Sequence, residues 1–426
     1  MLLNRECRLI KTGESLIKCA KFSKLAKDFN SLLMQIIHTA DWHLGQTFYS
    51  FERTDEHRVF LDWLANILKE RRTDLLLIAG DVFDSPNPSA EAQRMFYTFL
   101  RRVTTENPDL QVIITAGNHD SAARLEAPNP LLKTFKTHVS GIVHYKNDEI
   151  DYERMIVPVG DDTCCLAVPY LRHNDLPKAE TYSEGIAKFY SNLYEIAKEK
   201  YSRIIAMGHL QASGAEVSVG DNSEHAIIGG LEGIDSGFAK AGISYFALGH
   251  LHKAQRVGGR EHVRYSGAPL PMSFAERKNI QSVTQVSIDS QGTTIEKIIF
   301  DAPVKLLSIP EKPSPIEEIL PLLAALEDGE INNRSPFLEI KVLVKSVDPT
   351  LRNQIEQAIA GTSVRLARLE SVCEKKEGEK RVATFEEFKK TSPNELIEEL
   401  YMRMNGEEMP CELKDIMNDI IKEVVK

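Results

Sequence analysis

The chain has 426 residues, of which 42% are hydrophobic and 27% are charged, and its formal net charge is −10. This length predicts two or three domains, because domains commonly have about 100–200 residues. No apolar run reaches the roughly 18 residues that suggest a transmembrane helix, so no membrane span is predicted. The acidic balance argues against a protein that binds nucleic acid alone through a broad basic surface.

Residues 1–33 differ from the rest of the chain, with seven basic side chains against three acidic ones. They contain no apolar core of the kind found in a secretory signal. We expect a non-native extension from a start site assigned too early, since the first predicted strand begins immediately after Met34, which is itself a possible start. A basic DNA-binding arm is the alternative interpretation.

Residues 34–304 alternate between predicted strands and helices. Apolar side chains recur at helical spacing in two stretches and predict helices packed on a sheet. A further helix is predicted at about 183–200, a long loop from Gln211 to Phe238, and strands at about 262–267, 282–289 and 293–300. The two helical stripes are Val59, Phe60, Trp63, Leu64, Ile67 and Leu68, and Met95, Phe96, Phe99, Leu100 and Val103.

Five short polar motifs each follow or end an apolar run that predicts a strand. Ligands of open α/β sheets gather outside the carboxyl ends of the strands, so these motifs are expected to meet at one edge. Any one motif alone is explained more simply as a helix cap or a turn, but five together in this order favour a shared site. The motifs are Asp41-Trp42-His43, Gly80-Asp81, Gly117-Asn118-His119, Gly208-His209 and Gly249-His250-Leu251-His252.

Carboxylate, imidazole and amide oxygen ligands suit Mn²⁺, Fe²⁺ or Zn²⁺. Two such ions about 3.5–4 Å apart can hold both the attacking and the leaving oxygen of a displacement at phosphorus. Asp81, in the middle of the set, is the natural candidate for a carboxylate shared by both ions. His250 and His252 can point to one face, because alternate residues of an extended segment do so.

The order of these motifs resembles that of the calcineurin-like metallophosphoesterases. Longer stretches are similar to the bacterial SbcD nuclease subunits within that superfamily. The resemblance extends from Met34 to the C-terminus and implies an α/β fold, a β-sandwich flanked by helices. The matching stretches are His38–Gly45, Gly80–Asp84, Ala116–Ser121, Ala247–His252 and Tyr265–Pro269.

The resemblance implies a metal-dependent DNA nuclease that acts in repair, recombination and replication in the cytoplasm. Its activities would be a double-strand 3'-5' exonuclease and a single-strand and hairpin endonuclease. The implied cofactors are two divalent ions, Mn²⁺ first, with Mg²⁺, Fe²⁺ and Zn²⁺ as alternatives. The implied partners are DNA and an SbcC-like coiled-coil ATPase, with a homodimer of this chain inside a heterotetramer. The chain has no Walker motif of its own.

Carried over motif by motif, the resemblance implies two ligand sets and two catalytic candidates. His119 would protonate the leaving oxygen or stabilise charge on the phosphate. Asp84 is the second candidate, although related enzymes have a histidine there, which leaves its role open. The implied ligands are Asp41, His43, Asp81 and His252 for one ion, and Asp81, Asn118, His209 and His250 for the other.

Beyond a proline-rich boundary, residues 305–373 predict a small α/β module, which the resemblance identifies as a DNA-binding capping domain. Residues 374–426 predict a charged linker and two amphipathic helices that either fold back on the body or dock on a partner. The resemblance favours the ATPase as that partner. The alternative functions are a phosphatase or cyclic-nucleotide phosphodiesterase of the same superfamily, and a scaffold without activity.

Overall fold

The computed structural model describes residues 33–216, 242–344 and 348–373, together with residues 401, 409–410 and 413–414. Residues 1–32, most of the expected loop from Gln211 to Phe238 and most of the tail lie outside the described residues. The chain divides into two compact units, of which the first contains Met1–Leu343 and Val347–Val372. The description below concerns this first unit.

The first of two six-stranded sheets has the order β16-β15-β1-β4-β5-β6. β1, β4, β5 and β6 run parallel to one another. β15 pairs antiparallel with β1, and β16 pairs antiparallel with β15 at the edge of the sheet. The strands are β1 (Met34–Thr39), β4 (Leu75–Ala79), β5 (Gln111–Thr115), β6 (Thr137–Ser140), β15 (Ser282–Ile288) and β16 (Thr293–Ile299).

The second six-stranded sheet has the order β13-β14-β12-β11-β10-β9. β10, β11, β12 and β14 are parallel, and β9 and β13 pair antiparallel at the two edges. The strands are β9 (Ile156–Val159), β10 (Thr163–Ala167), β11 (Arg203–His209), β12 (Ile243–Gly249), β13 (Gln255–Val257) and β14 (Arg260–Tyr265).

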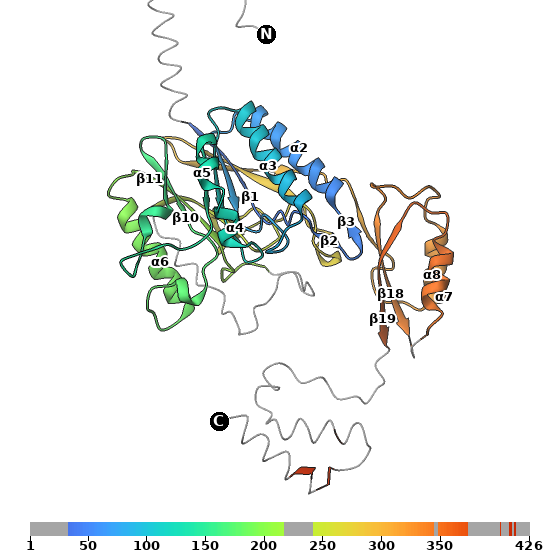
Figure 1. Cartoon of the computed structure of the whole chain (residues 1–426). Helices are drawn as coiled ribbons and strands as arrows, with labels where there is room; N and C mark the ends of the chain where they lie inside the picture. Colours follow the sequence, from blue (N-terminus) through green and yellow to red (C-terminus); the bar gives the residue numbers. More distant parts are fainter. Residues whose placement is uncertain are drawn as a thin grey trace, which may run out of the picture. The chain divides into compact units, whose positions relative to one another are not determined.

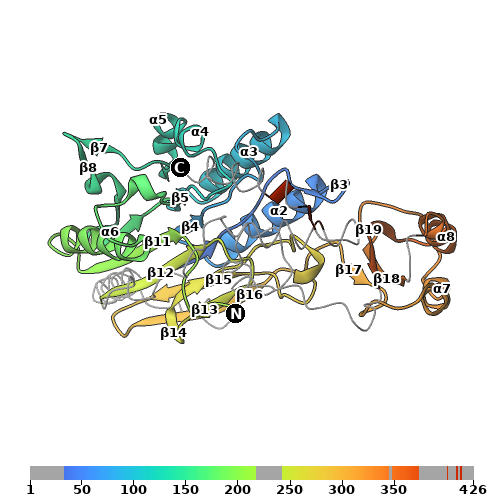
Figure 2. The ribbon, with the colours of Figure 1, turned by 90° about the horizontal axis from the view of Figure 1, so that it is seen from below.

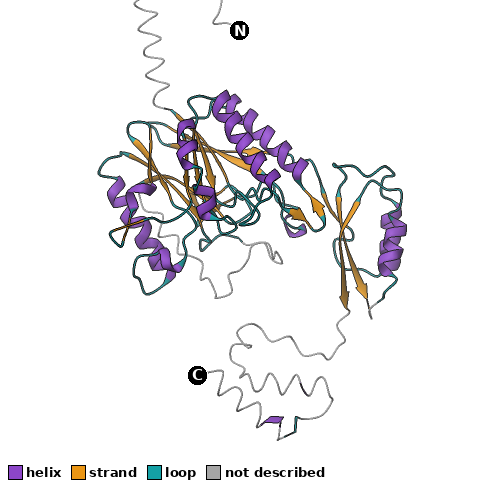
Figure 3. Cartoon of the chain, in the orientation of Figure 1, coloured by secondary structure: helices purple, strands orange, loops and turns teal. Residues whose placement is uncertain are grey.

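The two sheets pack face to face, and helices cover their outer faces (Figures 1 and 3). The inner layer contains fully buried side chains from both sheets, such as Leu77 and Ile113 from the first and Ile205 and Met207 from the second. Helices α2 (Thr54–Glu70) and α3 (Ala90–Glu106) cover the first sheet, and α6 (Tyr182–Ala197) covers the second. The predicted sandwich flanked by helices is therefore confirmed.

The helices lie where the apolar spacing predicts them. In α2, Phe60, Leu64 and Leu68 are fully buried against the first sheet. Burial of a side chain of this size stabilises the fold by about 1.5–3 kcal/mol. The start of α3 is fixed by Ser89, whose side chain accepts a hydrogen bond from the amide of Ala92 at 3.1 Å and so satisfies one amide that the first turn leaves unpaired.

A third sheet, of the order β17-β18-β19, lies within residues 305–373 and is covered on one face by two helices (Figure 2). Glu339 of this sheet is a fully buried charged residue. Its carboxylate accepts hydrogen bonds from Ser308 and Arg368 at 2.7 and 2.9 Å. The elements are β17 (Leu306–Ser308), α7 (Ile316–Ala324), β18 (Phe337–Val344), α8 (Leu351–Ala358) and β19 (Arg365–Cys373).

Short elements connect these layers. The element that matters most for the site is η5 (Phe274–Glu276), a single turn of 3-10 helix after β14. Within the described residues, no helix combines the length and the apolar character needed to cross a membrane. The other short elements are β2 (Thr47–Phe48), β3 (Phe51–Glu52), β7 (Tyr145–Lys146), β8 (Glu149–Ile150), α4 (Ala122–Glu126), α5 (Asn129–Leu132), η1 (Lys133–Phe135), η2 (Tyr152–Met155) and η3 (His173–Asp175).

Candidate metal centre

The carboxyl ends of five strands, three from the first sheet and two from the second, bring the polar motifs together. Asp41 and His43 follow β1, Asp81 follows β4, and His209 is the last residue of β11. Asp41, His43, Asp81 and His250 have positive φ angles of 55°, 46°, 48° and 101°. Such conformations are uncommon for residues other than glycine and concentrate at functional sites. The chain therefore turns sharply at the points where it presents these side chains.

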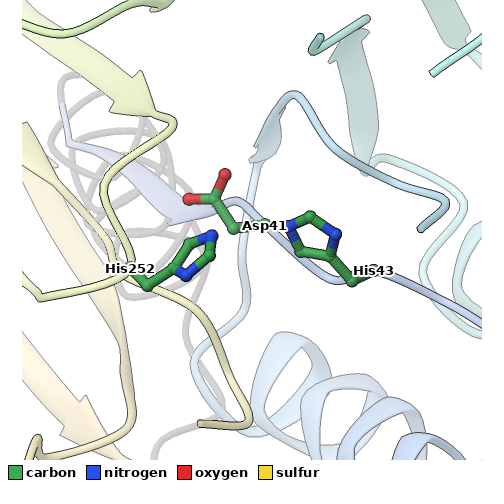
Figure 4. Close-up of side chains that lie close together, drawn as sticks. All are labelled: Asp41, His43 and His252. Carbon is green, nitrogen blue, oxygen red and sulfur yellow. The ribbon is translucent and has the colours of Figure 1, made fainter. Parts of the chain in front are cut away.

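One group of ligand-type side chains consists of Asp41, His43 and His252. One ligand atom from each lies within 4.8 Å of the others, and all three residues are buried. Figure 4 shows that Asp41 and His43 come from the segment after β1, whereas His252 reaches the same point from the segment after β12. Between Asp41 and His43, the side chain of Trp42 is fully buried in the core beneath α2 and α3.

A second group consists of Asn118, His209 and His250. The Oδ1 atom of Asn118 lies 3.0 Å from Nε2 of His209 and 3.1 Å from Nδ1 of His250. Oδ1 of Asn118 is thus close to one nitrogen of each histidine. Two neutral imidazoles with an amide oxygen are good ligands for a divalent transition metal.

Asp81 lies between the two groups. Its Oδ2 atom is 3.2 Å from Nε2 of His209 and 3.7 Å from Nε2 of His43. Its Oδ1 atom accepts a hydrogen bond of 2.8 Å from the amide of His119. A single carboxylate oxygen is thus close to both groups, which is the arrangement that a bridging ligand requires.

The absence of a side chain at two positions allows this convergence. At Gly80, which has a φ of 89°, an added Cβ would lie 2.1 Å from Nδ1 of His209. At Gly117, it would lie 2.1 Å from Oδ1 of Asp81. Real Cβ atoms do not approach other atoms so closely, so only glycine fits beside the side chains of His209 and Asp81 at these two positions.

For His209 and His252, Nδ1 makes a hydrogen bond to an oxygen, whereas for His43 it has only a carboxylate within ion-pair distance. Nδ1 of His209 contacts the carbonyl oxygen of Ala79 at 2.9 Å, and Nδ1 of His252 contacts Oε1 of Glu276 at 2.8 Å. Nδ1 of His43 lies 3.3 Å from Oδ1 of Asp84. A carbonyl oxygen only accepts, so Nδ1 of His209 donates and Nε2 is left to act as a ligand.

His119 lies beside these groups and is only partly buried. Its ring makes an edge contact with that of His43 at a centroid distance of 4.8 Å, and its Nδ1 donates to the carbonyl oxygen of Asp84 at 3.0 Å. Asn118, His119 and Asp84 are the partly exposed residues of this set, whereas Asp41, His43, Asp81, His209, His250 and His252 are buried.

Two further carboxylates, which the sequence analysis does not name as site residues, support this arrangement. Asp120 is buried, and its oxygens accept hydrogen bonds from the amides of Gly117, Phe83 and Val82 at 2.9, 3.0 and 3.2 Å. It thereby joins the loop after β5 to the loop after β4. Glu276 lies on η5, far from every motif in sequence, and no spacing rule points to it.

The electrostatics of the centre favour added positive charge. Burial raises the pKa of Asp41 above its ordinary value. Burial would also raise the pKa of Asp81, but His209, His43 and His119 lower it well below its ordinary range. Burial would lower the pKa of His209, yet Asp81 and Asp41 raise it to about 9. Two buried carboxylates thus draw a proton onto a histidine when they have no other cation nearby.

The donor set fits divalent metal ions. Oδ2 of Asp41 and Nε2 of His43 are buried atoms without a hydrogen-bond partner, which is costly unless a cation binds there. The groups that offer three acidic or histidine ligands within 4.8 Å are Asp41, His43 and His252; His43, Asp81 and His119; and Asp41, Asp81 and His209. These buried clusters are consistent with a site for two metal ions.

The chain is similar to proteins of a known family. The calcineurin-like phosphoesterase family matches residues 34–254, and the family described as the type 5 capsule protein repressor C-terminal domain matches residues 295–405. The SbcD subunit of the SbcCD nuclease from Rhodobacter capsulatus is 36% identical over 360 residues, covering 79% of this chain and 87% of that protein. The proteins of the same name from Escherichia coli K12 and Bacillus subtilis are 34% and 29% identical, covering 57% and 72% of this chain and 62% and 79% of their own lengths.

The position of Asp81 generates a test. Because one of its oxygens is close to both groups, Asp81→Ala should lose both ions, whereas Asp41→Ala should mainly weaken one. Metal analysis of the two purified variants after loading with Mn²⁺ would show the difference. Retention of two ions by Asp81→Ala would contradict the shared role of this carboxylate.

Proposed function

The chain belongs to the SbcD family of calcineurin-like metallophosphoesterase nucleases, and we propose that it is the subunit that hydrolyses phosphodiester bonds in DNA at a two-metal centre. The observation that carries this proposal is the approach of one Asp81 oxygen to histidines of two separate buried groups. The proposed centre uses both groups, since two ions about 3.5–4 Å apart can stabilise the attacking and the leaving oxygen together.

We assign the ligands as two sets that share Asp81. Asp41, His43 and His252 complete the first set, and Asn118, His209 and His250 complete the second. When bound, the two ions would supply an activated water and stabilise the charge that develops on the phosphate. The donors contain no thiolate and suit Mn²⁺, Fe²⁺ or Zn²⁺. We propose Mn²⁺ first, as the family resemblance implies, with Mg²⁺, Fe²⁺ and Zn²⁺ as alternatives.

His119 is proposed as the group that protonates the leaving oxygen. Its Nδ1 must be the donor in the hydrogen bond to the carbonyl of Asp84, so proton exchange with a substrate falls to Nε2. Its side chain is partly exposed while six of the seven proposed ligands are buried. The ring of His119 is therefore accessible to a phosphodiester that binds next to Asn118, which is also partly exposed.

Asp84 was expected among the catalytic residues, and its contacts suggest a positioning role. Its carboxylate lies 3.3 Å from Nδ1 of His43, and its carbonyl oxygen holds Nδ1 of His119 at 3.0 Å. One residue thus holds the proposed acid through a hydrogen bond to its main chain and places its carboxylate within ion-pair distance of a proposed ligand. We propose that Asp84 positions the ring of His119 and exchanges no proton with the substrate.

The proposed substrate class is DNA, cleaved as a 3'-5' exonuclease on duplex ends and as an endonuclease on single strands and hairpins in the cytoplasm. The support is the similarity to the SbcD subunits of SbcCD nucleases and the module of residues 305–373 beside the catalytic body. A phosphatase or cyclic-nucleotide phosphodiesterase has no evident need for that module, which we propose as a capping domain that contacts DNA.

The partner proposal concerns residues 374–426. Leu396, Leu400 and Ile416 belong to two apolar stripes at helical spacing in this part of the sequence. Apolar anchors at such spacing are typical of helices that dock in a groove of a partner. We propose an SbcC-like coiled-coil ATPase as that partner, with two copies of this chain in the complex. It would supply the ATP hydrolysis for which this chain has no Walker motif.

The choice of substrate can be tested directly. With Mn²⁺, the protein should degrade duplex DNA and hydrolyse the small diester bis-p-nitrophenyl phosphate, while p-nitrophenyl phosphate, a monoester, should react poorly. The assay compares initial rates on the three substrates at equal metal concentration. Fast hydrolysis of the monoester with intact DNA would favour the phosphatase alternative instead.

The proposed acid predicts a separation of catalysis from metal binding. His119→Gln should lower DNA cleavage by about 10²–10⁴, the usual effect of removing a proton donor. Its metal content should equal that of the wild type, because His119 is not among the seven proposed ligands. Cleavage rates and metal analysis on the same preparation decide the matter; a wild-type rate or the loss of both ions would exclude the assignment.

The tail predicts a variant that separates partner binding from chemistry. Replacing Leu396, Leu400 and Ile416 by Glu should abolish co-purification with the ATPase, since buried apolar anchors supply most of the energy of such docking. Metal content and hydrolysis of the small diester should not change. A chain that ends near Gly378 should also lose co-purification and keep its metal content and diester hydrolysis. Glu398→Gln, outside the apolar stripe, is the matched control and should co-purify as the wild type does. Undiminished co-purification of the truncated chain would show that the tail packs on its own body.

A further inference from the structure

Glu276 is a buried carboxylate that none of the proposed ligand sets includes. Its residue is 1% exposed and lies in η5, 24 positions after His252 in the sequence. A charged group at such a depth needs partners that offset the loss of hydration. Its partners therefore indicate what it does.

Both oxygens of Glu276 accept hydrogen bonds from defined donors. Oε1 lies 2.8 Å from Nδ1 of His252, and Oε2 accepts from the amide of Met272 at 2.9 Å. Since an ionised carboxylate only accepts, Nδ1 of His252 carries the proton. The deprotonated Nε2 is then the nitrogen that can bind an ion in the group with Asp41 and His43.

The turn that carries Glu276 is anchored from its other side. Phe274, also in η5 and 1% exposed, packs against Phe48 at a centroid distance of 5.3 Å. Phe48 in turn contacts Phe337 of β18 at 4.9 Å. Arg277 donates to Oε2 of Glu311 at 2.9 Å just beyond the turn. The carboxylate is thus held by a packed turn and does not sit on a free loop.

We propose that Glu276 is a positioning residue that fixes the ring of His252 so that Nε2 faces the first ion. The proposal rests on the ligand role assigned to His252 under the proposed function. A carboxylate on the outer nitrogen of a ligand histidine fixes its tautomer and orientation and strengthens it as a ligand. Asp84 lies 3.3 Å from Nδ1 of His43, but its side chain is 36% exposed and that nitrogen makes no hydrogen bond, so it does not hold the ring of His43 as Glu276 holds that of His252.

The test measures Mn²⁺ binding by the full-length, metal-free protein. In Glu276→Gln, one amide group replaces two acceptor oxygens and cannot serve both His252 and Met272. The affinity for one of the two ions should fall about 10–100-fold, the usual effect of losing such a partner. The other ion should bind as in the wild type. Excess Mn²⁺ should restore turnover, so the loss should appear in the Mn²⁺ concentration for half-maximal rate and not in kcat.

Two comparisons separate this role from a structural one and from a failure of the ligand assignment. Glu311→Gln, an exposed carboxylate beside the same turn, should bind both ions with wild-type affinity. In a double-mutant cycle, Glu276→Gln should add nothing to the loss caused by His252→Ala. If His252→Ala binds both ions normally, the assignment of His252 as a ligand fails. If His252→Ala loses one ion while Glu276→Gln binds two ions with full affinity, the positioning role of Glu276 fails.

A second variant covers the case in which Glu276→Gln lowers the unfolding midpoint. Glu276→Asp keeps the charge and both acceptor oxygens but shortens the reach to His252. Because the hydrogen bond to Nδ1 then lengthens, the affinity for the same ion should fall while the other ion remains. Wild-type affinity for both ions in a folded Glu276→Asp protein would overturn the proposal.

Discussion

The centre depends on the contacts of one carboxylate oxygen of Asp81 with histidines from both groups. This requirement brings the end of β4 against the last residue of β11, so the two sheets are in contact there. Ala79 at the end of β4 accepts the Nδ1 proton of His209 at the end of β11. The sandwich is therefore joined at the site by a contact that also sets which histidine nitrogen faces the centre.

The charge balance of the buried centre follows from the same constraint. Asp41 and Asp81 lie in a region that water does not reach, and each isolated charge there would be costly. Histidines surround them, and the carboxylates raise the pKa of His209 to about 9, whereas burial and the neighbouring His209 lower the pKa of His250 to about 3. The pKa values of the two imidazoles beside Asn118 are thus shifted in opposite directions, that of His209 by the carboxylates and that of His250 mainly by burial. Divalent cations remove that conflict, since neutral imidazoles then suit both positions.

The sequence predicts the strands, the two stripes of core residues on α2 and α3, and the meeting of the five motifs, because each depends on local spacing or on the general rule for strand ends. It does not predict Glu276, because a buried Glu in a short turn has no local pattern. Nor does it predict that the carboxylate of Asp84 reaches His43, because that contact depends on the loop after β4. Both contacts depend on how segments that are far apart in the chain pack together. No periodic pattern in a single sequence predicts such packing.

The η5 turn shows how such packing joins parts of the fold with different tasks. One of its residues, Phe274, belongs to the aromatic cluster that includes Phe337 of the three-stranded sheet. Another, Glu276, holds His252 at the candidate centre. The turn has only three residues, so the contact with the module of residues 305–373 and the contact with His252 lie within two positions of each other in the chain.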